Sequence, residues 1–434
     1  MRRPLVDIQI FKERRQRLGK VLEGSALVIP AHPEFLRNHD VHHPYRADSN
    51  FYYLTGFEEP EAVFVFRPGH TPETVMFVRP RDPLKETWNG FRFGPEGVMA
   101  HFAIDQAYNG DELKERLPKL LAPFDAVYYQ MFSNHEMDEV MAQVMMDVRL
   151  SQGRSGRGHM GILDPHEILG EMRLMKSAYE VSCLRKAAMI TAEGHKRAME
   201  FTHPGVNERQ VHATLLYHFM LGGAAREGYG SIVASGANAT TLHYVFNDQI
   251  CHDGDLLLID AGAEYQYYTA DITRTFPVNK KFTPAQRDVY QRVLQCQKAL
   301  IEMVRPGLKF KELQERAIVL LVGAMQDLKL LVGSQDEIIE KLLFKKYYPH
   351  GVSHWLGLDV HDIGLYKIDG ESRPLQSGMV FTVEPGLYIP KDDESAPKEL
   401  RGIGIRIEDN ILVTDIGYDN LTAGAPKEVA EIER

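Results

Sequence analysis

Residues 255–276 read DLLLIDAGAEYQYYTADITRTF. Both ends of this stretch are rich in apolar and β-branched residues, which is typical of β-strands. We predict an antiparallel hairpin that turns about Tyr265 and Gln266 and places Asp260 directly opposite Asp271 on one face. Because two carboxylates so close together repel each other unless a cation lies between them, the pair is a candidate metal site. For two aspartates alone, a surface hairpin with both side chains in water remains the favoured alternative.

Two further carboxylates follow apolar runs later in the chain. Glu384 ends the run 380–384, and Glu408 stands in GIRIEDNILV at 404–413. We predict that these two runs pair as strands. Arg406 lies two residues before Glu408, so both side chains share one strand face. Four carboxylates at the ends of apolar strands favour a metal centre over four solvated side chains.

Three histidines lie within HGVSHWLGLDVHD at 350–362. Glycines in this stretch allow tight turns and close backbone approach. A single histidine is commonly structural, whereas three in a glycine-punctuated apolar stretch favour a site. One histidine with four carboxylates suits two metals about 3.5–4 Å apart that clamp a shared water. Such hard oxygen ligands favour Mn²⁺, with Co²⁺, Fe²⁺ and Zn²⁺ as alternatives.

The length of the chain predicts two domains, because it has 434 residues and single cores stop growing at about 250–300 residues. We place the boundary before a helix that starts at Ser177, and so predict domains at 1–172 and 173–434. The first is expected to be a smaller α/β domain, with a helix at 135–146 and a loop at 151–158. Its predicted strands are 25–30, 61–66 and 74–78.

Helix-start signals organise the second domain. Ser177 and Glu180 form a capping-box pattern, as do Asn207 and Gln210. Residues 283–286 read TPAQ, with an N-cap, a proline at the first helical position and the box partner. Helices alternating with antiparallel strand pairs predict an α+β arrangement.

Composition narrows the class of protein. The net charge of −10 argues against nucleic-acid binding, which needs a basic surface. The three cysteines show no metal or disulfide spacing and favour a reducing compartment. Asp7, Lys12 and Glu13 interrupt any apolar signal segment, and apolar runs are far shorter than the ~20 residues of a membrane span. We therefore expect a cytoplasmic protein with no membrane partner.

At these residues the chain resembles the creatinase/aminopeptidase family of pita-bread metallopeptidases. Five ordered motifs of the C-terminal part carry the resemblance, and the N-terminal stretch YRADSNFYYLTGFEEPEAVFVF at 45–66 extends it. The motifs are LHY (242–244), LLLIDAGAEYQYYTADITRTFPVN (256–279), HGVSHWLGLDVHD (350–362), TVEPGLYIP (382–390) and RGIGIRIEDNILVT (401–414). The resemblance implies a pita-bread catalytic domain behind a smaller N-terminal domain.

The resemblance also implies a ligand set for two divalent metal ions. Asp260 would bind one ion through both oxygens, and Asp271 and Glu408 would bridge the two. His354 and Glu384 would complete the second ion, with Glu384 also placed to move a proton.

Other side chains acquire roles by the same resemblance. His243 and His361 would contact the substrate near the scissile peptide, and His350 would line the pocket beside proline. Arg406 would order hydrogen bonds around the metals, and Tyr388 would lie near them.

More distant contacts are implied as well. Tyr229 would lie near the site, and Trp88 would reach the pocket of a neighbouring subunit in a homo-oligomer, a dimer or a tetramer. Asp40 and one arginine, either Arg154 or Arg157, would provide contacts from the N-terminal domain.

The activity implied is release of the N-terminal residue from peptides with proline in second position. A dipeptidase for Xaa-Pro, using the same ligands, is the main alternative. SHWLG at 353–357 and the segment around Trp88 favour the aminopeptidase. A pita-bread domain that only binds a partner is disfavoured, because such relatives usually lack ligands and all five are present here.

Overall fold

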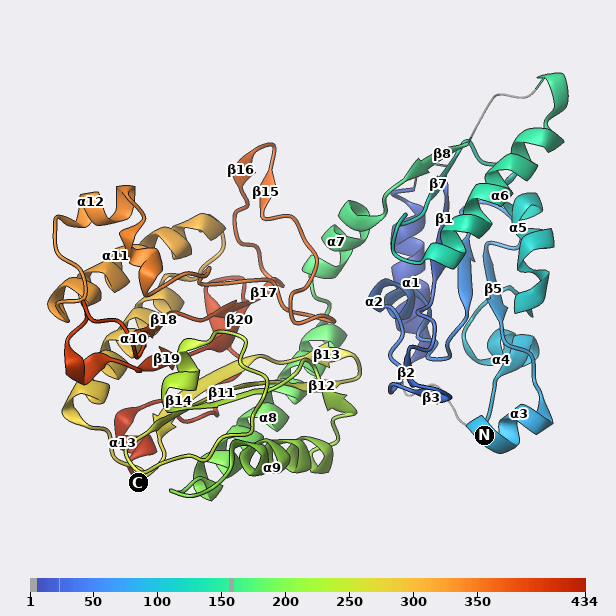
Figure 1. Cartoon of the computed structure of the whole chain (residues 1–434). Helices are drawn as coiled ribbons and strands as arrows, with labels where there is room; N and C mark the ends of the chain where they lie inside the picture. The colour runs from blue at the N-terminus through green and yellow to red at the C-terminus, as the bar shows by residue number, and fades with distance from the viewer. Residues whose placement is uncertain (1–5, 23, 156–159) are drawn as a thin grey trace. The chain divides into compact units, whose positions relative to one another are not determined.

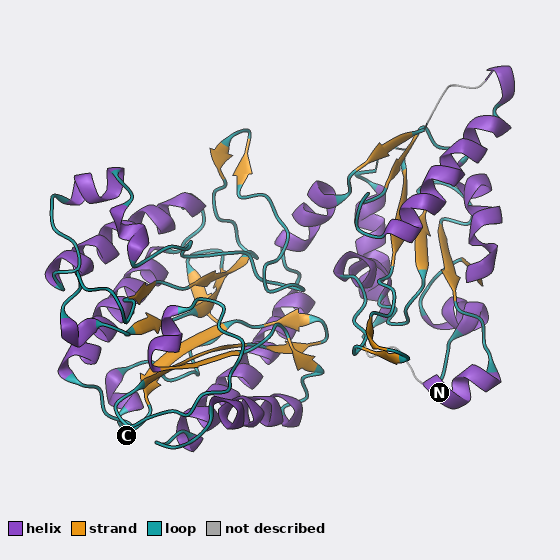
Figure 2. Cartoon of the chain, in the orientation of Figure 1, coloured by secondary structure: helices purple, strands orange, loops and turns teal. Residues whose placement is uncertain are grey.

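The computed structural model describes residues 6–22, 24–155 and 160–434 (Figure 1). The chain divides into two compact units, one ending at Met172 and the other running from Arg173 to Arg434. Both units mix helices and strands (Figure 2).

A six-stranded mixed sheet is the framework of the first unit. Its strands are β1 (Ala26–Pro30), β4 (Val63–Phe66), β5 (Thr74–Val78), β6 (Gln106–Asn109), β7 (Ala126–Tyr128) and β8 (Gly161–Leu163). They follow the order β6-β5-β4-β1-β7-β8, and a separate hairpin joins β2 (Leu36–Asn38) to β3 (Val41–His42). The strands predicted at 25–30, 61–66 and 74–78 are confirmed as β1, β4 and β5.

The helices of the first unit flank this sheet (Figure 1). They are α1 (Ile8–Gly19), α2 (Ser49–Thr55), α3 (Pro83–Asn89), α4 (Gly94–His101), α5 (Leu113–Leu121) and α6 (His135–Ser151), followed by α7 (His166–Leu174) at the boundary of the units. The predicted helix 135–146 is confirmed as α6, which Asn134 caps and which continues to Ser151. Of the predicted loop 151–158, Gly153–Ser155 form a 3₁₀ turn, and 156–158 lie outside the described residues.

The second unit packs helices against antiparallel strands. Its helices are α8 (Ala178–Phe201), α9 (Glu208–Leu221), α10 (Pro284–Met303), α11 (Phe310–Asp327), α12 (Gln335–Glu340) and α13 (Val429–Ile432). The side chains of Ser177, Asn207 and Thr283 cap α8, α9 and α10, each within a capping box, as the sequence predicts. The caps use backbone N–H groups that a helix start leaves unpaired.

Four small sheets support the site of interest. One has the order β10-β11-β14 and another β13-β12-β9; the third is β17-β20-β21 and the fourth β18-β19. These strands are β9 (Arg226–Glu227), β10 (Ile232–Ser235), β11 (Leu256–Ala261), β12 (Ala263–Tyr265), β13 (Tyr268–Thr269), β14 (Ile272–Pro277), β17 (Val380–Val383), β18 (Gly386–Tyr388), β19 (Gly404–Arg406), β20 (Asp409–Val413) and β21 (Tyr418–Asn420). A further hairpin joins β15 (Lys367–Ile368) to β16 (Glu371–Ser372).

The predicted hairpin forms, but its register differs from the prediction. Asp260 lies opposite Thr273 rather than Asp271. The turn is centred on Gln266 and Tyr267, which both adopt positive φ, so the whole ladder is displaced by two residues. Because a shift of two residues preserves the face of each side chain, Asp260 and Asp271 still project to the same side.

The predicted pairing of 380–384 with 404–413 is also corrected in detail. β17 pairs with β20, whereas β18 pairs with β19, so one expected ladder is divided into two. Glu384 and Glu408 both lie in the breaks between these strands. A break in pairing frees both side chains from a regular face and lets them converge.

Within the part of the chain that the structure describes, no helix has both the length and the apolar character that crossing a membrane requires.

Candidate active site

A cavity of ≈ 550 Å³ opens in the second unit. Ten of the side chains given roles in the sequence analysis line it, together with apolar side chains such as Leu242 and Val245. The ten are Asp260, Asp271, His354, Glu384, Glu408, His243, His361, His350, Tyr229 and Arg406. Segments far apart in the sequence therefore meet at one cavity.

The centre of the cavity wall is a candidate metal site. Asp271, His354 and Glu408 each offer one ligand atom, and these atoms all lie within 4.8 Å of one another. His354 Nδ1 donates to the Trp355 carbonyl at 3.1 Å, which turns Nε2 toward the carboxylates. Nε2 lies 3.5 Å from Asp271 and 3.6 Å from Glu384. A histidine oriented in this way through its other nitrogen is typical of metal ligands.

Asp260 completes the group of carboxylates from β11. The Tyr229 hydroxyl lies 2.6 Å from Asp260 and 2.5 Å from Asp271, and so bridges the two aspartates. Arg406 Nη2 donates to Asp260 at 2.5 Å. The predicted convergence of Asp260 and Asp271 is thus reached through a shared tyrosine rather than through a direct cross-strand pair.

Arg406 connects the carboxylates with the histidine side of the cavity. Its Nη1 donates to the Tyr388 hydroxyl at 3.0 Å, and that hydroxyl lies 2.8 Å from His350 Nε2. Because His350 Nδ1 faces the Gly351 carbonyl, Nε2 is the acceptor from Tyr388. Burial lowers the pKa of His350 to about 4, so its ring is neutral near pH 7.

The ionisation of these side chains is strongly perturbed. Burial, reinforced by the negative charge of Asp271, raises the pKa of Glu408 well above its ordinary value. Burial also raises the pKa of Glu384 to about 7. Burial alone would lower the pKa of His354, but its contacts with Asp271 and Glu384 outweigh it and raise the pKa to about 9. The carboxylates of the cavity carry more negative charge than the neighbouring side chains neutralise, and a bound cation would supply the missing positive charge.

A divalent cation fits these residues. Glu408 Oε2 accepts from Thr273 Oγ1 at 2.7 Å, whereas the buried Oε1 has no hydrogen-bond partner among the described residues. A buried carboxylate oxygen without a donor is costly. The orphaned oxygen faces His354 Nε2 at 4.0 Å, inside the ligand cluster, where a metal would satisfy it.

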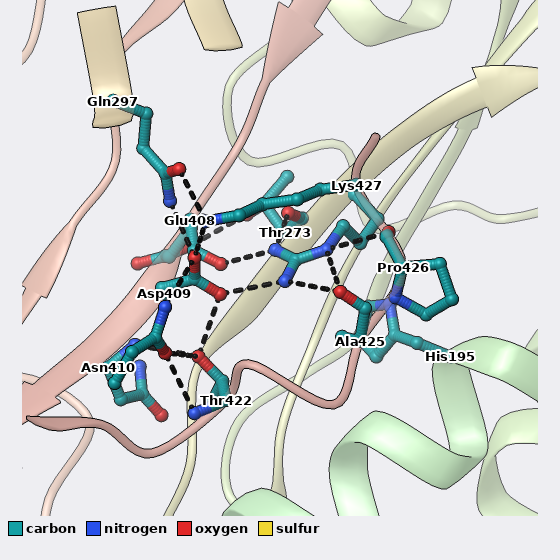
Figure 3. A network of polar contacts seen from close by, with 12 residues as sticks. His195, Thr273, Gln297, Glu408, Asp409, Asn410, Thr422, Ala425, Pro426 and Lys427 are labelled. Carbon is teal, nitrogen blue, oxygen red and sulfur yellow. Dashed lines mark hydrogen bonds and ion pairs between the residues drawn. The ribbon is translucent and has the colours of Figure 1, made fainter. Parts of the chain in front are cut away.

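Next to the candidate ligands lies a buried polar network that the sequence patterns do not single out (Figure 3). Asp409, next to Glu408, is paired with Arg274 at 2.7 Å and also with Lys427. Asn410 accepts from the backbone N–H of Asp271 at 3.0 Å and donates to the carbonyl of the same residue. Asp271 immediately precedes β14, and Asn410 gives its backbone the hydrogen bonds that a neighbouring strand would otherwise supply. These bonds hold the candidate ligand Asp271 in position.

The residues implied as N-terminal contacts belong to the first unit. Trp88 in α3 is 87% exposed, and Asp40 is exposed in the turn between β2 and β3. Arg154 is exposed, and Arg157 lies outside the described residues.

We expect the metal-free protein to lose stability as the pH rises from 6.5 to 8.5. In the folded state Glu408 and His354 hold protons that the unfolded chain has already released, so unfolding becomes easier as pH rises. Each retained proton contributes about 1.4 kcal/mol per pH unit, so the fall should approach roughly 2–3 kcal/mol per pH unit. His350 and His195, with pKa values lowered to about 4 and about 3, are neutral in the folded state throughout this window, and they offset the fall only near pH 6.5, where the unfolded chain still binds part of their protons.

Urea unfolding after chelation, at several pH values, measures this dependence. Saturating divalent metal should reverse the trend, because ligands must be deprotonated to bind it. A metal-free stability that is flat or rising over the window would contradict the electrostatic account of the cluster.

The carboxylate–histidine cluster, opening on a cavity of this volume, defines the second unit as a candidate metal-dependent hydrolase. Comparison with known proteins agrees. Residues 182–415 match the model of metallopeptidase family M24, and residues 11–128 match the N-terminal domain of aminopeptidase P. The chain belongs to metallopeptidase family M24 and is a metallo-aminopeptidase with the pita-bread fold.

Similar proteins extend along the whole chain. Xaa-Pro aminopeptidase of Haemophilus influenzae is 42% identical, with 98% of this chain and 96% of the relative covered. Human Xaa-Pro aminopeptidase 3 is 34% identical, with 97% of this chain and 82% of the relative covered. The structure of Pseudomonas aeruginosa aminopeptidase PepP aligns with a TM-score of 0.96 and 43% identity, and the alignment covers 100% of this chain and 98% of that one. A variant of Escherichia coli aminopeptidase P in complex with substrate aligns with a TM-score of 0.94 and 41% identity, and the alignment covers 99% of this chain and 98% of that one.

Proposed function

We propose that this protein releases the N-terminal residue from peptides that carry proline in second position. The observation that carries the proposal is the convergence of all five expected ligands on one cavity. The similarity to Xaa-Pro aminopeptidases over nearly the full chain supports the substrate class.

We propose two divalent metal ions as the cofactor, with Mn²⁺ preferred because oxygen ligands predominate. Asp260, Asp271, His354, Glu384 and Glu408 would hold these ions. When bound, the metal supplies Lewis acidity, which lowers the pKa of a water molecule and polarises the peptide carbonyl.

The side chains of the cavity would orient the peptide and move the proton. Glu384 would take a proton from the attacking water and pass it to the proline nitrogen as that bond breaks. His243 and His361 would donate to the carbonyl oxygen as it gains negative charge. His350, held neutral between Gly351 and Tyr388, would line the wall beside the proline ring.

A panel of peptides tests this function. With Mn²⁺ present, we expect Arg-Pro-Pro to lose its first residue and Arg-Ala-Pro to be cleaved at least about 100-fold less efficiently. A site shaped for the tertiary amide nitrogen of proline offers no acceptor for the N–H that alanine brings, so this N–H would be left unpaired. Activity confined to dipeptides such as Ala-Pro would instead identify an Xaa-Pro dipeptidase, and the absence of activity on all of these peptides would refute the proposal.

We also propose a cytoplasmic homo-oligomer, a dimer or a tetramer. The exposed side chains of Leu84 and Trp88, one turn apart on α3, support assembly, since neighbouring apolar side chains in water can mark an interface. Cys183, Cys251 and Cys296 are buried and form no disulfide, which supports a reducing compartment. Sedimentation velocity and cell fractionation test the two points, and a monomer or a secreted protein would contradict them.

A further inference from the structure

The loop between β10 and β11 forms one rim of the cavity. It contains a 3₁₀ turn, Gly236–Thr240, and then an irregular segment at 241–250. Leu242, His243 and Val245 of this segment line the cavity. An irregular segment has no ladder of its own to fix it, so other groups must set the position of His243.

Glu208, at the start of α9, is fully buried beneath this loop. Its Oε1 accepts from the backbone N–H and the hydroxyl of Ser235, both at 2.7 Å, and from Asn238 Nδ2 at 3.1 Å. Its Oε2 accepts from the Tyr244 hydroxyl at 2.8 Å and the Gln249 N–H at 3.0 Å. One carboxylate thereby joins the beginning, middle and end of the loop through five neutral donors.

The side chains of the segment alternate around this contact. Tyr244 is buried and turned toward Glu208, whereas its neighbours His243 and Val245 are exposed and line the cavity. Asn247 adds a second anchor, because its side chain accepts from Val233 N–H at 2.9 Å and donates to the Ser231 carbonyl at 2.8 Å. Both anchors therefore lie on the face of the loop away from the cavity.

We propose that Glu208, acting through Tyr244, is a positioning residue that sets His243 against the peptide substrate. This inference rests on the proposed function for the role of His243. Glu208 does not contact the cavity, and the metal ligands come from other strands and loops. Its loss should therefore weaken catalysis while metal content stays unchanged.

Two variants test the inference. Tyr244→Phe removes one donor and leaves every backbone contact of Glu208 in place. Glu208→Gln is more severe, because each carboxylate oxygen accepts a backbone N–H, so either orientation of the amide sets an NH₂ group against an N–H. We expect kcat/KM on Arg-Pro-Pro to fall about tenfold for Tyr244→Phe and further for Glu208→Gln, since small displacements of positioned groups cost up to about 100-fold.

A double-mutant cycle with His243→Ala separates positioning from general destabilisation. In the His243→Ala background, Tyr244→Phe should change kcat/KM less than twofold, because the group it positions is gone. Tyr129→Phe is the matched control: its hydroxyl donates to Asp138 at 2.7 Å in the first unit, and its loss should leave kcat/KM unchanged. Effects of Tyr244→Phe that are independent of His243, or within twofold of wild type, would overturn the inference.

Hydrogen exchange gives a readout that does not depend on the activity. Peptides spanning 241–246 should exchange faster in Tyr244→Phe, with metal content equal to wild type. If the wild-type protein fails to cleave Arg-Pro-Pro, the proposed function fails, while faster exchange still supports the anchoring of the loop. Unchanged exchange overturns the anchoring whatever the activity.

Discussion

Glu408→Gln should remove tightly bound metal and lower kcat/KM by at least about 1,000-fold, because catalysis by a bound metal accounts for several kcal/mol of barrier. The substitution keeps the shape of the side chain, and the Thr273 hydroxyl can still hydrogen-bond to it. What changes is the charge at the oxygen that lacks a partner in the metal-free site. Elemental analysis after gel filtration measures the metal content.

The same variant should raise the melting temperature of the metal-free protein. Glu408 is buried among other carboxylates, and its raised pKa shows that its charge is unfavourable there. In the metal-free folded state Glu408 must take up a proton that the unfolded chain has released at neutral pH, and a neutral amide avoids this cost, whereas in the presence of metal the order of stability should reverse. The stabilisation by metal that we expect for the wild-type protein should therefore be lost in Glu408→Gln.

Asp409→Asn is the matched control, one residue along the chain. Asp409 is equally buried, but Arg274 and Lys427 pair with it and lower its pKa. Removing this charge leaves buried cations without a partner, which costs about 3–5 kcal/mol. Asp409→Asn should therefore lower the melting temperature with or without metal. Near-normal metal content and turnover in Glu408→Gln would refute the assignment of Glu408 as a ligand.

Glu384→Gln should lower kcat by about 100-fold to 10,000-fold, the usual contribution of a general acid or base. An amide oxygen can still lie against a metal, but it cannot accept and return a proton. In the metal-free site the pKa of Glu384 is raised to about 7, mainly by burial, which shows how responsive this carboxyl is to its surroundings.

Titration with excess Mn²⁺ separates the two proposed roles of Glu384. If Glu384 moves the proton, metal should saturate the variant without restoring turnover, and KM for Arg-Pro-Pro should change little. Recovery of kcat to within about tenfold of wild type at high metal concentration would mean that Glu384 serves as a ligand alone.

Local patterns predicted much of the fold. Capping boxes at Ser177, Asn207 and Thr283 mark helix starts that the structure confirms. The apolar runs identify β11 and β14, and the odd spacing of Asp260 and Asp271 correctly places them on one face. Their exact register was wrong, because it depended on which two residues form the turn, and Gln266 and Tyr267 adopt a backbone conformation that their side chains do not signal.

The sequence by itself determined which side chains are available for chemistry and where most elements begin, because these depend on neighbours within a few residues. Only the tertiary structure decided how they meet. Asn410 is 139 residues from Asp271, and Glu208 is 36 residues from Tyr244, yet each pair is joined by hydrogen bonds. Buried polar groups must find partners wherever packing brings them, and no local periodicity encodes such partners. The proposed ligands could therefore be named from the sequence, whereas the groups that hold them and the His243 loop in place emerged from the fold.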